Sequence, residues 1–294
     1  MHTGGLLVGA HMSVAGGLEH AITAAVACGF NCMQLFTHSP RVWEAVLANG
    51  EECEHFRMLR RAHRIRFVSV HAPYLPNLAT PDDKLWERSL ATIRRDVKVS
   101  EAIGADVYVM HPGSRKGSSV KEAVRRVGEA LKQLCEGGVP KVQLVLETTS
   151  GGGTMLGGRL EELAEIITIA EGSVPGLRCG VCIDTAHVFA AGWDVRRATG
   201  VASLMEGLRG TVGVNRLRMV HANDSMHGHG TGRDQHAHIG IGKIGLEGFR
   251  ELMKVALLRR VPWILETPKD DEGADVRNRM ALERVYHSTR RHVR

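Results

Sequence analysis

Short, almost wholly apolar runs recur along the chain, and they constrain its fold more than any other feature. Each run holds four to six residues. Together they cover residues 6–11, 32–37, 67–71, 108–111, 143–147, 179–184, 218–221 and 263–266. Runs that are apolar throughout, instead of alternating with polar residues, predict strands buried on both faces, as in a parallel sheet. The sequence therefore indicates eight buried strands.

Helical patterns occupy most of the intervals between these runs. Ser119 and Glu122 have the spacing of a capping box, and apolar residues follow them at helical spacing. Residues 82–103 and 158–169 carry similar apolar stripes. Strand and helix alternating eight times predict an α/β protein, a single (β/α)8 TIM barrel. We expect one domain, residues 1–294, with its functional site at the carboxyl-terminal face of the strands.

Six of the eight runs end in a side chain that can bind a metal ion. The six are His71, His111, Glu147, Asp184, His221 and Glu266. Neighbouring members are 36 to 45 residues apart, which is about one strand and one helix, so in a barrel all six lie on the same rim. An imidazole or carboxylate at the end of a buried strand costs free energy unless a partner compensates it. One shared metal site is a more economical explanation than six separate structural roles.

Three further candidate ligands lie in loops of the same rim. His187 follows Asp184 by three residues, and Asp234 and His236 form a D-x-H pair in a glycine-rich segment. Nitrogen and oxygen ligands of these types suit zinc, with manganese or iron(II) as alternatives. Nine ligands exceed what one ion uses and fit three ions with one shared carboxylate. Because three divalent ions outweigh four carboxylates, the site favours an anion, and a phosphodiester fits a cluster that activates water.

The composition narrows the class of protein. A net charge of +6 and a pI near 9.1 permit an anionic partner such as nucleic acid. Aromatic residues make up only 4% of the chain, which argues against a stacking surface for single strands. No apolar run approaches the ~18 residues of a membrane span, and no basic segment precedes the first apolar stretch as in a signal peptide. Six scattered cysteines fit a reducing compartment, so we expect a cytoplasmic protein.

Seven motifs, in this order and spacing, are similar to those of a known family. They are GAHMSVAGG at 9–17, VHAPYL at 70–75, MHPGS at 110–114, LETT at 146–149, GVCIDTAH at 180–187, VHAND at 220–224 and ILET at 264–267. On these motifs the chain resembles endonuclease IV, the zinc-dependent apurinic/apyrimidinic endonucleases of base-excision DNA repair. The resemblance implies a TIM barrel, three zinc ions, and hydrolysis of the phosphodiester 5′ to an abasic site in double-stranded DNA. The products would be a 3′-hydroxyl and a 5′-deoxyribose phosphate.

The resemblance also implies a role for each candidate residue. His71, His111 and Glu147 would hold the first ion; Glu147, Asp184, His221 and Glu266 the second; and His187, Asp234 and His236 the third. Glu147 would bridge two ions and orient the attacking hydroxide. Arg41, Tyr74 and Leu75 match positions that, in the family, enter the base stack and hold the flipped-out abasic nucleotide. A 3′-phosphodiesterase activity on blocked 3′ ends, a monomeric state and association with the nucleoid through DNA are further expectations.

Three positions depart from the family pattern, and two other functions stay open. Thr148 stands where asparagine is usual, Gln235 where arginine is usual, and Ile241 interrupts a Leu-Gly-Glu-Gly motif. None of them removes a candidate ligand, but they bear on DNA affinity and substrate range. A sugar isomerase or epimerase on a related barrel uses one or two metals and needs no third set of ligands. A damaged-DNA-binding protein without turnover is the other alternative.

Overall fold

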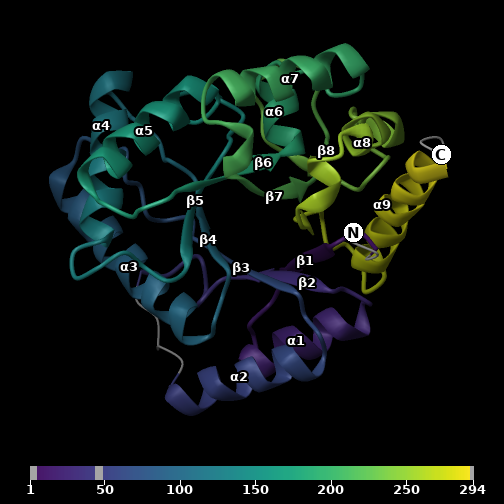
Figure 1. Ribbon diagram of the computed structural model, residues 1–294, viewed down its shortest axis with the longest axis horizontal. Helices are drawn as coiled ribbons and strands as arrows, with labels where there is room; N and C mark the ends of the chain where they lie inside the picture. Colours follow the sequence, from purple (N-terminus) through teal and green to yellow (C-terminus); the bar gives the residue numbers. More distant parts are fainter. Residues whose placement is uncertain (1–4, 44–48, 292–294) are drawn as a thin grey trace.

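Eight parallel strands close into a barrel at the centre of the molecule (Figure 1). The computed structural model describes residues 5–43 and 49–291. Neighbouring strands are hydrogen-bonded in the order β1-β10-β7-β6-β5-β4-β3-β2, so the chain follows the barrel round and the last strand closes on the first. The barrel strands are β1 (Val8–Met12), β2 (Cys32–Leu35), β3 (Phe67–His71), β4 (Val107–Met110), β5 (Gln143–Glu147), β6 (Gly180–Asp184), β7 (Leu217–Ala222) and β10 (Trp263–Leu265). A separate antiparallel pair consists of β8 (Asp224–Ser225) and β9 (His236–Ala237).

Helices follow most of the strands and surround the barrel (Figure 1). The α-helices are α1 (Leu18–Ala27), α2 (Gly50–Ala62), α3 (Asp83–Ala102), α4 (Val120–Leu134), α5 (Leu160–Ser173), α6 (Thr185–Ala191), α7 (Ala198–Gly210), α8 (Gly245–Lys254) and α9 (Ala274–Arg291). Two 3-10 turns are η1 (Val214–Arg216) and η2 (Leu258–Arg260). The TIM barrel predicted from the alternating runs is confirmed. Across residues 5–43 and 49–291, no helix has the length and hydropathy that a membrane span requires.

Side-chain caps begin two of the helices where the sequence predicted a start. The Asp82 carboxylate accepts a hydrogen bond from the backbone N–H of Leu85 at 3.0 Å, and the Ser119 hydroxyl accepts one from the N–H of Glu122 at 3.1 Å. Each cap satisfies an N–H group that the first turn of a helix leaves without a partner. These caps fix the entries to α3 and α4.

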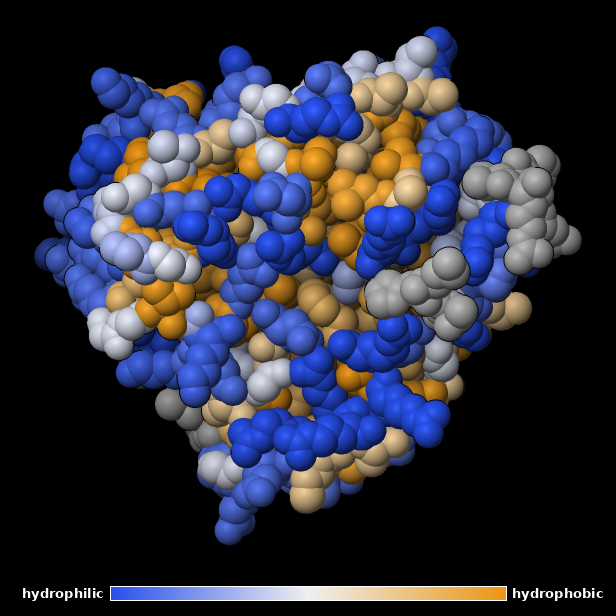
Figure 2. Space-filling model, viewed as in Figure 1, coloured by the Kyte–Doolittle hydropathy of each residue, from blue (hydrophilic) through white to orange (hydrophobic). Residues whose placement is uncertain are grey.

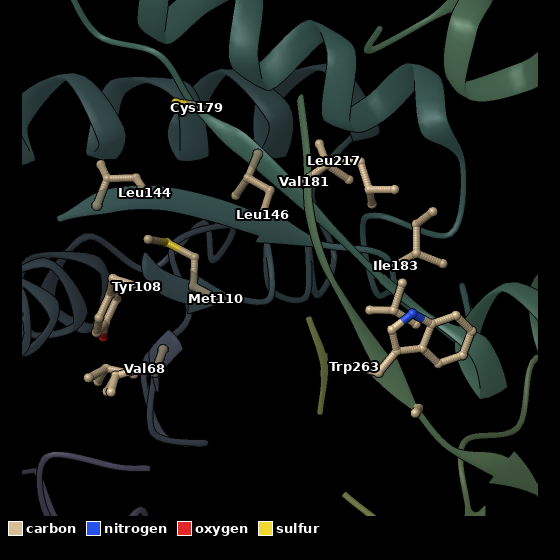
Figure 3. Close-up of a cluster of buried hydrophobic side chains, with 14 of the residues drawn as sticks. Val68, Tyr108, Met110, Leu144, Leu146, Cys179, Val181, Ile183, Leu217 and Trp263 are labelled. Carbon is tan, nitrogen blue, oxygen red and sulfur yellow. The ribbon is translucent and has the colours of Figure 1, made fainter. Parts of the chain in front are cut away.

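Successive side chains of the barrel strands point alternately toward the helices and toward the barrel axis. Leu144 and Leu146 on β5, and Val181 and Ile183 on β6, belong to the large buried cluster that also contains the inner faces of the helices (Figure 3). The intervening positions form a second apolar cluster, which consists of Cys32, Val107, Val109, Val145, Cys182, Met219 and Ile264. This second cluster fills the barrel with a layer of apolar side chains.

The outer surface is mostly hydrophilic in the view of Figure 2, with apolar side chains visible between the polar ones. Large apolar residues that are more than a third exposed come from different elements, among them Met58 of α2, Val120 of α4 and Met280 of α9. Single exposed apolar residues are normal for a protein surface. These exposed side chains therefore need no functional explanation.

Candidate metal centre

A layer of polar side chains lies on top of the apolar layer, at the carboxyl ends of the strands. The next inward position on a strand comes two residues later, so Val109 is followed by His111 and Val145 by Glu147. The same step gives the other members of the layer, which are His11, Gln34, His71, Asp184, His221 and Glu266. His111 and Glu266 lie one residue beyond β4 and β10, where the chain leaves the sheet. Strand alternation thus brings all six predicted strand-end residues to one rim.

Glu147 is at the centre of this layer and is fully buried. Its Oε2 lies 3.1 Å from His71 Nε2 and 3.4 Å from His111 Nε2. Its Oε1 lies 2.9 Å from His221 Nδ1 and 3.4 Å from His187 Nδ1. One carboxylate therefore faces four imidazoles, two through each oxygen. This is an arrangement suited to a carboxylate shared between two metal ions.

The end of β6 supplies two candidates through a direct change from strand to helix. Asp184 is the last strand residue and the N-cap of α6, and its Oδ1 accepts a hydrogen bond from the His187 N–H at 2.9 Å. The Asp234 carboxylate lies 2.8 Å from His187 Nε2 and 3.3 Å from His236 Nε2. Asp184 Oδ2 lies 3.6 Å from His236 Nε2. The structure thus brings His187, Asp234 and His236 together beside Asp184, although His187 lies in α6 and His236 in β9 instead of in loops.

Within the described part of the chain, overlapping groups of side chains could each hold a metal ion. The groups are His71, His111 and Glu147; Glu147, Asp184, His221 and Glu266; His71, His221 and Glu266; and Asp184, His187 and His236. The ligand atoms of each group lie within 4.8 Å of one another. The buried Nε2 of His236 has no hydrogen-bond partner among the described residues, although two carboxylates are near it. Such a nitrogen, in a set of imidazoles and carboxylates, fits a zinc-like divalent cation.

Hydrogen bonds to backbone carbonyls fix which nitrogen three of the histidines present. His71 Nδ1 lies 2.7 Å from the Ala72 carbonyl oxygen, and His187 Nδ1 lies 2.7 Å from that of Thr148. His236 Nδ1 lies 3.0 Å from the carbonyl oxygen of Glu266. Because a carbonyl only accepts, each Nδ1 is the donor and each Nε2 faces the centre.

Gln34 holds His221 so that its Nδ1, and not its Nε2, faces the centre. The Gln34 amide nitrogen donates to Glu266 Oε1 at 2.5 Å and to His11 Nδ1 at 3.0 Å. Its amide oxygen accepts from Ser69 Oγ at 3.0 Å and from His221 Nε2 at 2.9 Å. A flipped amide would place its oxygen against the Glu266 carboxylate, so the carboxylate fixes the amide. His221 consequently presents Nδ1, the nitrogen that faces Glu147.

Replacing Gln34 with methionine, which keeps the size of the side chain, is expected to lower the affinity for metal about tenfold to a hundredfold. The variant removes the acceptor that holds His221 in place and the donor to Glu266. Competition with a chromogenic zinc chelator measures the affinity. Gln133→Met on α4, outside the barrel, is the matched control and should bind metal like the wild type. Unchanged affinity in the Gln34 variant would contradict this role.

Imidazoles and carboxylates in the layer stabilise each other's charged forms. Burial favours the neutral form of Glu147, but the nearby imidazoles, His221 above all, hold its pKa well below the usual range. Burial likewise disfavours a charged His236, yet Asp184 and Asp234 raise its pKa to about 9. Protons on the imidazoles therefore supply the positive charge that these carboxylates need, which a divalent cation can supply equally well.

A cavity of about 610 Å³ lies against the polar layer. Its walls include His71, His111, His187, Asp234, His236 and Glu266 and, from the loops, Phe36, Tyr74, Gln235 and Lys269. Tyr74 is 68% exposed, and its ring meets the Phe36 ring edge-on at 5.4 Å. Leu75 lines the adjacent cavity, and Arg41 is exposed on the loop after β2. The three predicted DNA-contact residues thus lie on loops at the same end of the barrel as the candidate ligands.

Several residues that hold the layer in place were not predicted from the sequence. Besides Gln34, Asn223 donates to Asp184 Oδ2 at 2.6 Å and accepts from the Glu266 N–H at 2.9 Å. The period-two pattern of the strand runs could have identified Gln34, because it is the polar inward position of the second run. Asn223 follows a strand in a loop, and nothing in the local pattern distinguishes it.

The three departures from the family pattern have different structural contexts. Thr148 accepts a hydrogen bond from the Asp184 N–H through its Oγ1 at 3.0 Å, besides the carbonyl contact to His187. Gln235 lines the cavity and lies 3.0 Å from His227 Nε2 through its amide oxygen. Ile241 is 80% exposed. Thr148 therefore supports the candidate ligands directly, whereas Gln235 faces the space that a substrate would enter.

Comparisons with known proteins define the class first. Residues 22–285 match the family described as xylose isomerase-like TIM barrel. A D-tagatose 3-epimerase-like protein has the same fold, with a TM-score of 0.70 at 19% sequence identity over 97% of this chain and 100% of that one. The chain thus belongs to the xylose isomerase-like TIM barrel family, and it shares its fold with a D-tagatose 3-epimerase-like protein.

Closer relatives define the family within that class. A probable endonuclease 4 of Halothermothrix orenii is 37% identical over 262 residues, which cover 89% of this chain and 93% of the relative. The crystal structure of endonuclease IV from Thermus thermophilus is 34% identical, with a TM-score of 0.82 and coverage of 97% of this chain and 99% of that one. This chain belongs to the endonuclease 4 family of nucleases, as its motifs predicted.

Proposed function

We propose that the protein is a metal-dependent endonuclease of DNA repair that hydrolyses the phosphodiester 5′ to an abasic site in double-stranded DNA. One observation carries the proposal: eight side chains able to bind metal lie in overlapping groups at one rim, beside a cavity, and Asp234 contacts two of them. Membership of the endonuclease 4 family supports it, since a sugar-converting barrel of this class matches only at low identity. The products are a 3′-hydroxyl and a 5′-deoxyribose phosphate.

Three zinc ions are the proposed cofactors, with manganese or iron(II) able to replace zinc in part. We assign the first to His71, His111 and Glu147, the second to Glu147, Asp184, His221 and Glu266, and the third to His187, Asp234 and His236. When bound, such ions lower the pKa of water and neutralise charge on the phosphate. The ligands assigned to the third ion differ from the corresponding group of neighbouring side chains described above, in which Asp184 accompanies His187 and His236. Asp234 contacts both histidines more closely, which favours it as the ligand.

The chain's own residues fix the positions at which this chemistry takes place. Glu147 faces four imidazoles and would therefore help to hold the first two ions. Its buried carboxylate is also placed to orient the attacking water. Gln34 and the backbone carbonyls hold the imidazoles in single orientations, so little reorganisation is needed when the substrate reacts.

Lesion recognition is proposed for the loops beside the cavity. Tyr74 is strongly exposed and supported by Phe36, while Leu75 lines the adjacent cavity. An arginine together with an aromatic and an aliphatic side chain can fill the gap left by a missing base, so Arg41 is proposed to enter the base stack with Tyr74 and Leu75. Extruding a nucleotide costs least where no base pairs. These residues thus select abasic sites without reading the sequence.

The same centre is proposed to remove blocked 3′ ends, since the bond broken is again a phosphodiester. We propose that the protein acts as a monomer, because one chain supplies all nine candidate ligands. It would work in the cytoplasm, associated with the nucleoid through DNA. Its affinity for DNA is expected to fall with rising salt, since contacts to phosphates release counterions.

The decisive experiment incubates the zinc-loaded protein with a duplex that carries one abasic analogue, with and without a chelator. Cutting 5′ to the lesion that the chelator abolishes is the expected result. A matched duplex without the lesion is the control and should stay intact. Binding without cutting would favour a damaged-DNA-binding protein. Neither binding nor cutting, together with turnover of a ketose, would favour a sugar epimerase.

A further inference from the structure

A second cavity lies at the opposite end of the barrel from the candidate metal centre. It has a volume of about 300 Å³, and its charged lining consists of Arg66, Arg259, Arg260 and Arg290. Arg66 precedes β3, and Arg259 and Arg260 belong to η2, which precedes β10. Arg290 is near the end of α9, which follows β10 and runs from the carboxyl-terminal end of the barrel back toward its amino-terminal end. The cavity therefore lies at the amino-terminal ends of the strands and shares no residue with the metal centre.

The charge of this cavity is strongly positive. Four of its eight lining residues are arginines, and none is acidic. None of the four forms an ion pair with a carboxylate of residues 5–43 or 49–291. At the neighbouring start of β4, Asp106 is already paired with Arg60 at 2.6 Å and accepts the Val68 N–H at 2.7 Å. The cavity thus gathers positive charge without a counter-ion from the described residues.

Two of the four guanidinium groups are held in place by the fold. Arg259 donates through Nη1 to the carbonyl oxygens of Met253 at 2.6 Å and Lys254 at 3.0 Å, at the end of α8. Arg290 donates to the Tyr286 hydroxyl at 3.2 Å, and its guanidinium carbon lies 5.6 Å from the centre of that ring. Cations that are already ordered lose less conformational entropy when a ligand binds. The remaining N–H groups of both side chains make no hydrogen bond with the residues that the structure describes.

We propose that this cavity binds the phosphate group of a small anion, of the size of inorganic phosphate or pyrophosphate. Guanidinium groups match the geometry of phosphate oxygens and donate two parallel hydrogen bonds. A volume of about 300 Å³ is at the lower limit of small-molecule sites, which suits a compact anion. The phosphodiester backbone of DNA offers the same chemical group and is the other possible source.

Calorimetric titration of pyrophosphate into the metal-loaded full chain tests the proposal. The pocket variant R66Q/R260Q removes two cations whose side chains make no hydrogen bond within the described ranges. The control K121Q/R284Q removes two exposed cations outside the cavity. Binding at the metal centre contributes equally to all three proteins, so only their differences report on the cavity. We expect the pocket variant to bind pyrophosphate at least tenfold more weakly than both.

A second titration with an undamaged DNA duplex separates the two sources of phosphate. Wild-type affinity of the pocket variant for the duplex assigns the cavity to small anions. If the pocket variant binds the duplex tenfold more weakly than the wild type but binds pyrophosphate equally well, the cavity is assigned to the DNA backbone. Equal affinities of wild type and pocket variant for both ligands overturn the proposal. If R66Q/R260Q has a lowered unfolding temperature, R290Q replaces it in the same comparison.

Discussion

Replacing Glu147 with glutamine is expected to reduce cleavage of an abasic-site duplex by about a thousandfold or more, while the barrel stays folded. An ion that stabilises transition-state charge contributes several kcal/mol, and about 4 kcal/mol corresponds to a thousandfold change in rate. Glutamine has the same shape as glutamate, but one of its two terminal groups is an NH₂ group that cannot bind a cation. Because Glu147 faces two imidazoles through each oxygen, the loss affects both sides of the centre.

Two measurements check this expectation together. Single-turnover cleavage rates report the loss of activity, and metal analysis of the purified variant should show fewer ions per chain than the wild type. Glu251→Gln is the matched control, since Glu251 pairs with Lys254 on α8 outside the barrel. Its cleavage rate should equal that of the wild type. Near-normal turnover by the Glu147 variant would contradict the assignment of the centre.

The barrel and the gathering of the candidate ligands were predictable because both depend on repetition. Eight apolar runs at regular intervals leave few folds, and parallel strands of a barrel end on one rim. His111 and Glu266 lie just beyond their strands, so the predicted runs were one residue too long at these points. The side chains nevertheless reach the same layer, because the inward–outward alternation continues into the first loop residue.

The orientation of each ligand was not predictable, because it depends on contacts between residues far apart in the sequence. His221 presents Nδ1 only because Gln34 occupies its Nε2, across 187 residues. His71 presents Nε2 because the carbonyl oxygen of the next residue, Ala72, accepts from its Nδ1. His187 does so because the Thr148 carbonyl oxygen, 39 residues away in the sequence, accepts from its Nδ1. No periodicity records such a pairing. The sequence could name the candidate ligands but not the nitrogen atom that each candidate histidine presents.

Histidines outside the candidate ligand set also could not be distinguished from the candidates by the sequence alone. His238 pairs with Asp270 at 2.8 Å and accepts from Asn278, and His229 donates to the Gly192 carbonyl oxygen at 2.8 Å. In the sequence they stand in the same glycine-rich segment as His236. Only the fold separates His236, which points to the carboxylates of the centre, from its neighbours.

Without metal, the protein is expected to lose stability as pH rises from about 6.5 to about 9. The pKa of His236 is about 9 in the folded protein and near the ordinary 6.5 in the unfolded chain. The contribution of His236 to the free energy of unfolding is therefore complete below pH 6.5 and is lost as pH rises through 9. The loss amounts to about 3 kcal/mol. His187, near Asp184 and Asp234, has a raised pKa despite its burial and acts in the same direction. The carboxylates, whose pKa values are lowered, contribute stability that is lost only on acidification.

Bound metal is expected to offset this dependence on pH, and the comparison of the metal-free and zinc-loaded forms is the test. Cations bind deprotonated imidazoles, so their affinity rises over the same pH range in which the protons leave. The midpoint temperature of thermal unfolding of the chelator-treated protein should fall by roughly 10 °C between pH 6.5 and 9. The midpoint temperature of the zinc-loaded protein should change little over the same range. In the metal-free form, His236→Gln should make the midpoint temperature depend less on pH. The control His63→Gln replaces an exposed histidine and should leave the pH dependence unchanged. Parallel curves for the metal-free and zinc-loaded proteins would show that protons and metal do not share these side chains.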